Sequence, residues 1–257
     1  MAVWIGTSGW QYKDWRERFY PIGTAQSRWL EHYADRFRVV EVNNAFYRLP
    51  EATTFEAWAA RTPGDFVVAV KAGRYLTHVK RLQAPAEPVQ RFMARAAHLG
   101  PKLGPVLLQL PPSLAIDLRA LENTLDRFPP EVRVTVELRH ESWFIDDTRR
   151  LLAERGVALC LADSPRRRTP AWRTAGWGYL RLHEGRARPH PCYGRQALST
   201  WAERLAQMWP PSADVYVFFN NDHLACAVRD ARVFALACRR AGLSPTRVPT
   251  AGEVRAG

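Results

Sequence analysis

The fold is decided by the stretch Thr135-Val136-Glu137-Leu138-Arg139-His140-Glu141-Ser142-Trp143-Phe144. It continues an apolar run at residues 132–136, which predicts a buried strand, and then turns polar abruptly. Side chains alternate between the two faces of a strand, so Glu137 and Arg139 are expected on one face and His140 on the other. Charged groups at the end of a buried strand are costly unless they are paired or used. This strand end is therefore the first candidate site.

The same pattern, an apolar run that ends in polar residues, recurs along the whole chain. Helical periodicity follows most of the runs, which is the spacing of parallel α/β proteins. Besides the opening stretch, which supplies the fifth strand, strands are predicted at residues 3–8, 38–43, 66–71, 106–110, 157–161, 178–183 and 214–219. Helices are predicted at residues 24–36, 53–61, 86–98, 117–127, 147–155, 196–208 and 224–241. Residues 164–177 are irregular and stand in place of a full helix after the sixth strand.

Eight such units in 257 residues predict a single TIM-type (β/α)8 barrel with parallel strands. A dinucleotide-binding fold is disfavoured because no GxGxxG sequence follows the first strand. We expect one barrel domain at residues 1–245 and a loosely ordered C-terminal tail at residues 246–257.

Composition bounds the environment of the protein. No run of 18 apolar residues is present, so no membrane partner is expected. The first residues lack a charged leader and a long apolar run, which predicts a cytoplasmic protein. The four cysteines form neither a CxxC nor a zinc-ligand spacing, and we expect all four to be reduced.

The chain is strongly basic, with a formal net charge of +12. Only four of its 37 basic residues are lysines. A solvated arginine-rich surface accounts for this bias, and attraction for nucleic acid or for an anionic substrate is the alternative. The basic run at residues 166–168 is either a solvated turn or a clamp for phosphate.

In closed α/β barrels the active site lies at the carboxyl ends of the strands. The candidate catalytic residues there are Glu137, His140, Lys71 and His183. The candidate substrate-binding residues are Asn43, Tyr47, Gln109, Arg139, Arg181, Asn220, Asn221 and Asp222. The charges of Glu41, Glu137 and Asp163 would balance those of Lys71, Arg139 and Arg181, which predicts a nearly neutral pocket.

Three of these residues have more than one interpretation. Lys71 is a counter-ion to Glu41, a general base or a Schiff-base nucleophile, since a buried lysine can lose its proton and an arginine cannot. His140 and His183 suit proton transfer near neutral pH. Packing beside Trp143 is the alternative role for His140.

A metal site can be drawn from Glu41, Glu137, His183 and Asp222, whose oxygen and imidazole ligands suit magnesium, manganese or zinc. The interleaved lysine and arginine residues oppose it, and no HExxH motif supports it. We therefore predict no metal ligands and name no cofactor.

Seven ordered blocks together resemble the YecE-like family, known as domain of unknown function 72. They are GTSGWQYKDW…FYP, VEVNNAFYRLP, FVVAVKAGRYLTHVKRL, LGPKLGPVLLQLPPS, VELRHESWF, YLRLHEG…YG and DVYVFFNND. The resemblance runs from Ile5 to about Leu236 and implies a TIM-type barrel without a settled activity. It points to the candidate residues above and, in addition, to His78 and Lys80. Glu17, Glu184 and Ala225 stand where glycine is common in the family.

The functional prediction is a basic barrel protein with a polar pocket, which acts on a small polar or anionic, sugar-like or phosphorylated substrate by acid/base chemistry. The sequence leaves open whether the chain is an enzyme, and isomerase, lyase and hydrolase reactions are all compatible with the pocket. One alternative is a protein that binds or processes nucleic acid through its basic surface. Another is a non-catalytic, ligand-binding barrel.

Overall fold

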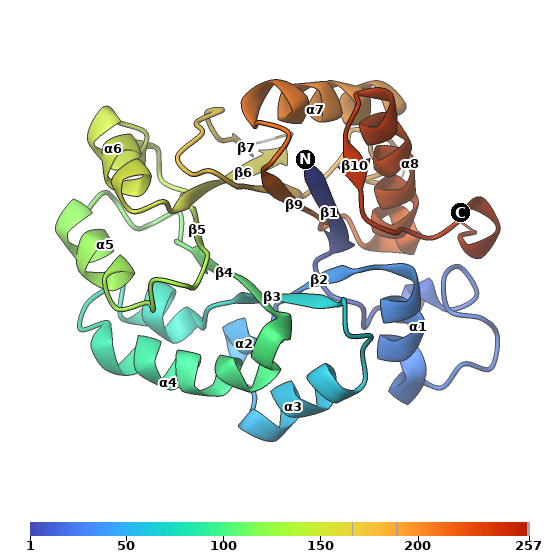
Figure 1. Cartoon of the computed structure of the whole chain (residues 1–257), viewed down its shortest axis with the longest axis horizontal. Coiled ribbons are helices and arrows are strands. Elements are labelled where there is room, and N and C mark those ends of the chain that lie inside the picture. Colours follow the sequence, from blue (N-terminus) through green and yellow to red (C-terminus); the bar gives the residue numbers. More distant parts are fainter. Residues whose placement is uncertain (166, 189, 256–257) are drawn as a thin grey trace.

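The computed structural model describes residues 1–165, 167–188 and 190–255. Within these residues the strands form one sheet of ten strands, with the helices on its outer side (Figure 1). The strands are β1 (Ala2–Thr7), β2 (Val39–Val42), β3 (Val67–Lys71), β4 (Leu103–Gln109), β5 (Val134–Glu137), β6 (Ala158–Ser164), β7 (Arg167–Arg168), β8 (Gly178–Leu182), β9 (Asp214–Phe219) and β10 (Ser244–Pro245).

The helices follow the strands along the chain and lie close to the predicted ranges. They are α1 (Trp29–Arg36), α2 (Asn44–Tyr47), α3 (Ala52–Ala60), α4 (Ala86–Ala96), α5 (Leu118–Leu125), α6 (Asp146–Glu154), α7 (Arg195–Met208) and α8 (Cys226–Arg240). Each long helix buries one face against the sheet, as amphipathic helices do. In α8 the buried residues Ala227, Ala231, Phe234 and Cys238 recur every three or four positions. The sequence did not predict α2.

The predicted closed barrel is wrong, although the α/β class with parallel strands is confirmed. The hydrogen-bonded order is β10-β1-β9-β8-β6-β5-β4-β3-β2, and the pairs are parallel except that β7 runs antiparallel to β6. Within the described residues, no ladder of backbone hydrogen bonds joins β1 to β2. The sheet is therefore a curled, open half-barrel rather than a closed eight-stranded barrel.

The physical reason lies at the seam between β1 and β2, where β10 pairs with the first residues of β1 and a tyrosine side chain takes the place of the ladder at its last residue. The Tyr33 hydroxyl from α1 accepts a hydrogen bond from the Thr7 backbone N–H at 3.0 Å and bonds the Val39 carbonyl oxygen at 3.1 Å. The two strands still approach closely, since a Cβ atom on Gly6 would lie 2.3 Å from the Val39 oxygen. Tyr33 thus satisfies backbone groups that a closing ladder would have paired.

The segment after β6 contains no helix among its described residues between 165 and 177. Its side chains bond the backbone of β6 instead. The Thr174 hydroxyl accepts from the Leu159 N–H at 2.8 Å, and the Thr169 hydroxyl accepts from the Ala162 N–H at 2.9 Å. Arg166, part of the basic run considered as a phosphate clamp, lies outside the described residues.

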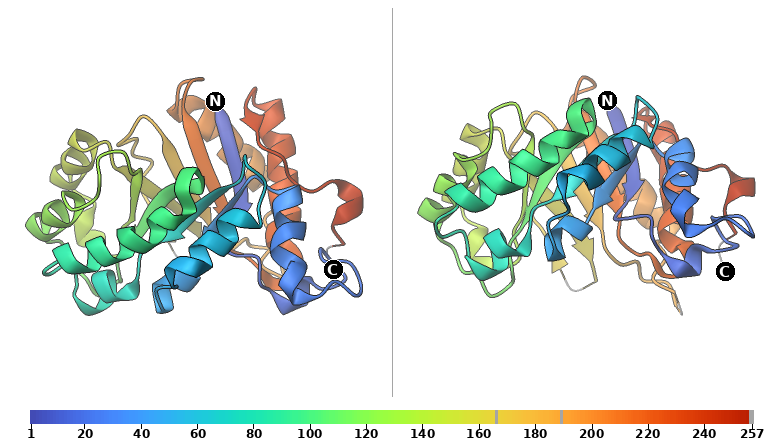
Figure 2. Two further views of the ribbon diagram at one scale, coloured as in Figure 1. Left: turned by 60° about the horizontal axis from the view of Figure 1, so that its bottom comes forward. Right: turned by 90° about the horizontal axis from the view of Figure 1, so that it is seen from below.

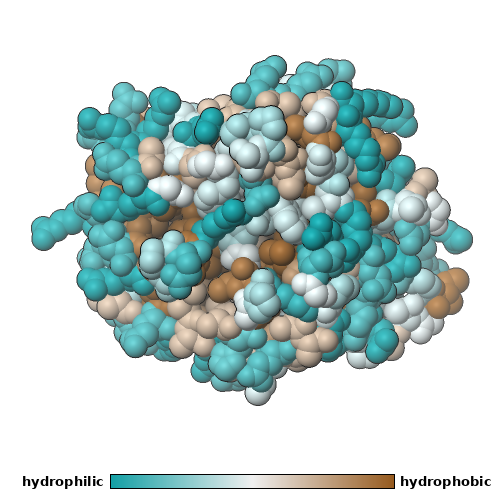
Figure 3. Space-filling model, viewed as in Figure 1, coloured by the Kyte–Doolittle hydropathy of each residue, from teal (hydrophilic) through white to brown (hydrophobic). Residues whose placement is uncertain are grey.

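The sheet has apolar residues on both faces, in two separate clusters. The larger cluster fills the space between the sheet and the helices. A smaller inner cluster lies on the concave face and consists of Val39, Ala69, Leu107, Ala158, Cys160, Ala175, Trp177, Tyr179, Tyr216 and Phe218. Figure 3 views the side of the molecule at which β1 begins, and brown hydrophobic residues show there between teal hydrophilic ones. The carboxyl ends of the strands, with α2 and the loops beyond them, lie on the opposite side (Figure 2).

The C-terminal segment continues from β10 along the edge of β1 that lies opposite β9. The Thr246 hydroxyl accepts from the Ile5 N–H at 3.1 Å, and Arg247 contacts Asp65. The predicted division at residue 245 into a domain and a tail stays a prediction, and so does the cytoplasmic location. None of the helices in the described residues is long and apolar enough to cross a membrane.

Candidate functional site

A chain of buried charges crosses the carboxyl end of the sheet on its concave face. Arg181 of β8 lies between two carboxylates from strands that are distant in the sequence. Its Nη2 donates to Glu41 Oε1 of β2 at 2.8 Å, and its Nη1 donates to Glu137 Oε2 of β5 at 2.6 Å. All three side chains are buried. Because the sheet curls, β2 and β5 both come near β8, and the side chains of residues 41, 137 and 181 meet.

Gln109 extends this chain to Lys71. Lys71 Nζ donates to Gln109 Oε1 at 2.8 Å, and Gln109 Nε2 donates to Glu137 Oε2 at 3.0 Å. Gln109 and Glu137 are register partners in β4 and β5, which fixes their side chains next to each other. The ring of Phe46 from α2 covers the amine of Lys71, with its centroid 3.5 Å from Nζ. We name the buried set Glu41, Lys71, Gln109, Glu137 and Arg181 the floor of the site.

Partly exposed side chains surround the floor. Arg139 Nε donates to Glu137 Oε1 at 2.7 Å, and the side chain is 23% exposed. His183 Nε2 lies 3.6 Å from the same oxygen and is 21% exposed. Asn220 Oδ1 accepts from Arg181 at 2.9 Å. These residues face both the buried charges and solvent, as groups that receive a ligand must.

The electrostatics of the floor keep its acids ionised. Burial alone would raise the pKa of Glu137, but Arg181, His183 and Arg139 outweigh it and hold that pKa well below its usual value. The pKa of Glu41 is likewise lowered, because Arg181 and the Tyr179 hydroxyl offset its burial. Lys71 behaves differently. Burial, followed by the charge of Arg181, lowers its pKa to about 8.

The nearly neutral pocket predicted from the sequence is not what the structure shows. Asp163 points away from the concave face, and its Oδ2 accepts from Trp201 Nε1 of α7 at 2.8 Å. It lies one residue beyond Ala162, which pairs with Arg181, so strand alternation turns it outward. The site then has two carboxylates, Glu41 and Glu137, against the three cations Lys71, Arg139 and Arg181. An excess of positive charge at a concave site favours anions.

Four of the predicted site residues lie apart from the floor. His140 accepts at Nδ1 from the Ser142 N–H at 3.2 Å and contacts the Ser142 hydroxyl at 2.8 Å, so it caps the short 3-10 helix Glu141–Trp143. Tyr47 is 78% exposed. Asn221 donates to Asp230 Oδ2 at 2.8 Å on the side of α8.

Asp222, the fourth, is a half-buried carboxyl in the loop after β9. Burial raises its pKa to about 7, although the neighbouring Tyr12 hydroxyl partly opposes the shift.

Asn43, at the end of β2, is closer to the floor, and its Nδ2 lies 3.4 Å from Glu41 Oε1. His78 packs edge-on against Phe46 beside Lys71. Burial and the charge of Lys71 lower the pKa of His78 to about 4.

Two residues of the site were missed in the sequence. The Tyr179 hydroxyl donates to Glu41 Oε2 at 2.6 Å, while its ring belongs to the inner cluster. Strand alternation offered a signal, because Tyr179 is two residues before Arg181 and shares its face. Phe46 stands out in the sequence as an aromatic residue in the loop after the second strand, but its contact with Lys71 depends on the unpredicted helix α2.

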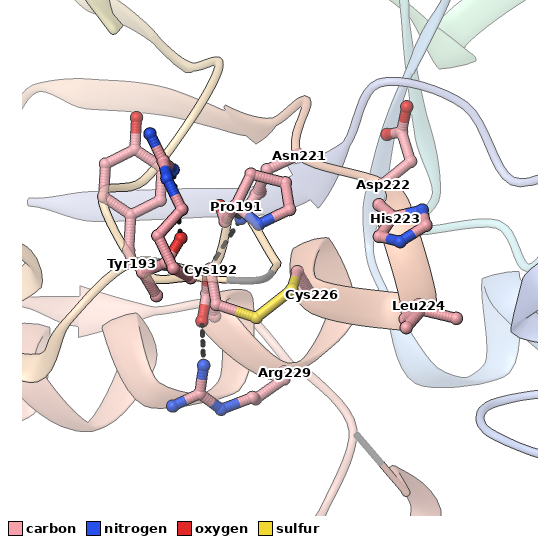
Figure 4. The surroundings of a disulfide bond; sticks show 12 residues. Pro191, Cys192, Tyr193, Asn221, Asp222, His223, Leu224, Cys226 and Arg229 are labelled. Atoms are coloured by element: carbon pink, nitrogen blue, oxygen red, sulfur yellow. Dashed lines mark hydrogen bonds and ion pairs between the residues drawn. A yellow bond between two sulfur atoms is a disulfide. The ribbon is translucent and has the colours of Figure 1, made fainter. Parts of the chain in front are cut away.

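The expectation that all cysteines are reduced is wrong for two of them. Cys192 and Cys226 form a disulfide that ties the loop after β8 to the first residue of α8 (Figure 4). The same loop is held by Asn221, whose Nδ2 donates to the Pro191 carbonyl at 3.0 Å. Cys160 and Cys238 are free and buried. The pairing could not be read from the sequence because the two cysteines are 34 residues apart.

Two loops beside the site adopt left-handed backbone conformations at non-glycine residues. Glu17 has φ of 61° and Ala225 has φ of 62°. The family that this sequence resembles commonly has glycine at both of these positions. Glycine adopts such angles without steric cost, so the resemblance and the backbone agree on the shape of these loops.

No group of three or more histidine, cysteine, aspartate or glutamate side chains that could hold a metal ion occurs within the described ranges. Of the ligand set drawn from the sequence, Glu41 and Glu137 are already paired with Arg181.

The fold and site define an α/β protein with a curled parallel sheet and a buried, charged site at its carboxyl ends. The family model described as "Protein of unknown function DUF72" matches residues 4–252, and the chain belongs to this family. The UPF0759 protein YecE of Escherichia coli (strain K12) is 27% identical in an alignment of 248 residues that covers 88% of this chain and 88% of YecE. The UPF0759 protein YunF of Bacillus subtilis (strain 168) is 26% identical over 257 residues, covering 86% of this chain and 89% of YunF.

Solved structures share the fold. A DUF72 family protein from Thermotoga maritima MSB8 matches with a TM-score of 0.81 and 28% identity, over 93% of this chain and 100% of that chain. A DUF72 family protein from Enterococcus faecalis V583 matches with a TM-score of 0.78 over 96% of this chain and 98% of that chain. At 18% identity the latter likeness concerns the fold alone.

Proposed function

We propose that the protein binds a small anionic, sugar-like or phosphorylated substrate at the carboxyl ends of its strands and acts on it by acid/base chemistry. The observation that carries this proposal is the excess of cations at the site. Lys71, Arg139 and Arg181 outnumber Glu41 and Glu137, and the two carboxylates are held ionised by their hydrogen bonds. An incoming anion compensates the remaining positive charge.

Arg139 is the group best placed to receive that anion. Its Nε is fixed on Glu137, while its two terminal nitrogens make no hydrogen bond with the described residues. A guanidinium that is oriented in this way presents two parallel N–H donors, the geometry that carboxylate and phosphate oxygens accept.

Proton transfer falls to His183 rather than to Glu137. Three donors occupy the oxygens of Glu137, so this carboxylate orients Arg181 and Arg139 instead of exchanging protons. The imidazole of His183 lies beside the carboxylate and remains partly exposed. A partly exposed imidazole beside a carboxylate is the kind of side chain that serves as a general acid or base.

Calorimetric titration with ribose 5-phosphate and with ribose tests the proposal. We expect measurable binding of the phosphorylated sugar only. The substitution Arg139→Gln is expected to weaken that binding by about 10- to 100-fold, since hydrogen bonds to charged groups contribute about 1.5–3 kcal/mol. Arg133→Gln, at the opposite end of the sheet, is the matched control and should bind as the wild type does. Equal affinity for both sugars, or an unchanged affinity of Arg139→Gln, would refute the proposal.

A further inference from the structure

Lys71 is a buried lysine without a carboxylate partner. It is 7% exposed, and its amine contacts the neutral amide of Gln109 and the ring of Phe46. No carboxylate of the described residues lies within 4.0 Å of the amine. Glu41, the counter-ion considered from the sequence, instead bonds Arg181 and Tyr179. Ion pairing therefore does not explain why a lysine stands here, and a buried cation without such a pair is costly.

Arginine fills almost every other basic position of the chain, and it also fills the two cationic positions next to Lys71. The property that distinguishes lysine is that its amine can lose the proton and become a nucleophile. The surroundings favour that change. The charges of Arg181 on β8, Glu41 on β2, Glu137 on β5 and Arg139 beyond β5 act on the amine, and the amine in turn acts on the His78 ring. Burial and Arg181 lower the pKa of Lys71 to about 8, and the two carboxylates only partly oppose them.

We propose that Lys71 forms an imine with the carbonyl group of an aldehyde or ketone that also carries an anionic group. This inference rests on the function proposed above, because Arg139 holds the anionic group while the carbonyl carbon lies at Lys71. It narrows the substrate class to phosphorylated or carboxylated carbonyl compounds, such as the open-chain form of a sugar phosphate.

The step balances without any further reactant. The ammonium of Lys71 releases a proton, and the lone pair on Nζ attacks the carbonyl carbon. The C–N bond forms as the π pair of the C=O bond moves to oxygen, which takes up a proton. A second proton then passes from the nitrogen to this oxygen, which departs as water while the nitrogen lone pair forms the C=N bond of the iminium ion. Overall, ammonium and carbonyl become iminium and water, so the positive charge stays on the nitrogen.

The surroundings of Nζ suit the charged product. The face of the Phe46 ring, 3.5 Å from Nζ, stabilises a cation without competing for its proton. Glu41 and Glu137 stay ionised and attract the iminium charge. The amide of Gln109 fixes the amine in place as the only hydrogen-bond acceptor recorded for it in the described part of the chain.

Reductive trapping tests the inference, and the presence of only four lysines makes the result simple to map. The protein is incubated with glyceraldehyde 3-phosphate and sodium cyanoborohydride, and the modified lysines are identified by peptide mass spectrometry. We expect Lys71 to be modified at least ten times faster than Lys102. Lys102 is the matched comparison because burial also lowers its pKa, yet it bonds the Thr62 carbonyl at 2.6 Å, away from the site.

Two variants complete the test. Lys71→Arg should lose the fast modification while keeping a wild-type circular dichroism spectrum, and Lys102→Arg should keep it. If Lys71→Arg does not fold, trapping in the wild type in the presence of excess inorganic phosphate replaces it, and phosphate should slow the modification of Lys71 alone.

The outcomes separate this inference from the proposed function. Binding of ribose 5-phosphate together with modification of Lys71 no faster than that of Lys102 overturns the imine and leaves the proposed function standing. If unphosphorylated glyceraldehyde modifies Lys71 fast and ribose 5-phosphate does not bind, the role of Lys71 as a nucleophile is supported and the proposal of an anionic substrate is overturned. Absence of both binding and fast modification overturns both.

Discussion

At the amino end of the sheet the concave face holds Trp4, Trp177 and Tyr216, whereas at the carboxyl end it holds Glu41, Glu137 and Arg181. Each end also has an arginine paired with a carboxylate. Arg133 and Asp214 approach to 2.8 Å at the amino end, with side chains 43% and 30% exposed, while the pairs of Arg181 are buried. The same strands thus support an aromatic layer at one end and a charged layer at the other.

The difference teaches which end is built for stability and which for a ligand. The aromatic layer gains free energy from burial of apolar surface. A buried ion network gains little net stability, because desolvation of its charges offsets their attraction. Burial of these charges therefore adds little to the stability of the fold. Ligand binding explains the charged end better than folding does.

The largest expected effect comes from removing Arg181 at the carboxyl end, and removal of Arg133 at the amino end is the matched comparison. Arg181→Met leaves Glu41 buried without a cation and Glu137 with Arg139 alone, and should reduce the free energy of unfolding by about 3–5 kcal/mol. Arg133→Met removes a partly exposed pair and should cost less than about 1 kcal/mol. Urea unfolding followed by tryptophan fluorescence measures both. Equal losses would remove the contrast between the two ends.

The seam between β1 and β2 offers the next largest effect. Tyr33→Phe removes the hydroxyl that bonds Thr7 and Val39 and should destabilise the protein by about 2–3 kcal/mol, since two buried backbone groups lose a partner. The loss is measured in the same unfolding experiment. A cost close to zero would mean that the two strands can pair directly and close the sheet.

A smaller effect is expected where the two layers meet. Tyr179→Phe keeps the ring in the aromatic layer but removes the hydrogen bond to Glu41, and should cost about 1–2 kcal/mol. Tyr216→Phe removes a hydroxyl that only accepts from Arg133 at 3.2 Å and should cost less than about 1 kcal/mol. A larger loss for Tyr216→Phe, measured by urea unfolding, would place the sensitive layer at the amino end.

An effect of a different kind, a dependence of stability on pH, is expected at the carboxyl end. Burial raises the pKa of Asp222 from 3.8 to about 7 in the folded protein. Between about pH 4 and pH 7 the folded state then holds a proton that the unfolded state has lost, so this group makes stability fall as pH rises. Asp222→Asn should flatten the decline. Thermal unfolding of both proteins from pH 4 to pH 8 checks this, and parallel curves would contradict the assignment.

Much of the site was predictable because it depends on strand alternation. The alternation that groups Glu137 with Arg139 and turns His140 outward holds, and His140 indeed serves as a local cap. Asp163 was misplaced because residues at strand ends were all taken as facing the pocket, although alternation alone turns it outward. Phe46 and the disulfide partner of Cys192 were beyond prediction, because each depends on loops that meet only in three dimensions.

The sequence by itself determined the alternation of strands and helices, the parallel α/β class and the polar carboxyl ends, because these follow from periodicity within single segments. Only the tertiary structure decided that the sheet stays open at the Tyr33 seam and that Arg181 joins Glu41 to Glu137. It also decided that Lys71 rests on an amide and an aromatic ring instead of a carboxylate. The reason is physical: pairings between distant segments depend on the curl of the sheet and on competition among neighbours for the same hydrogen-bonding groups.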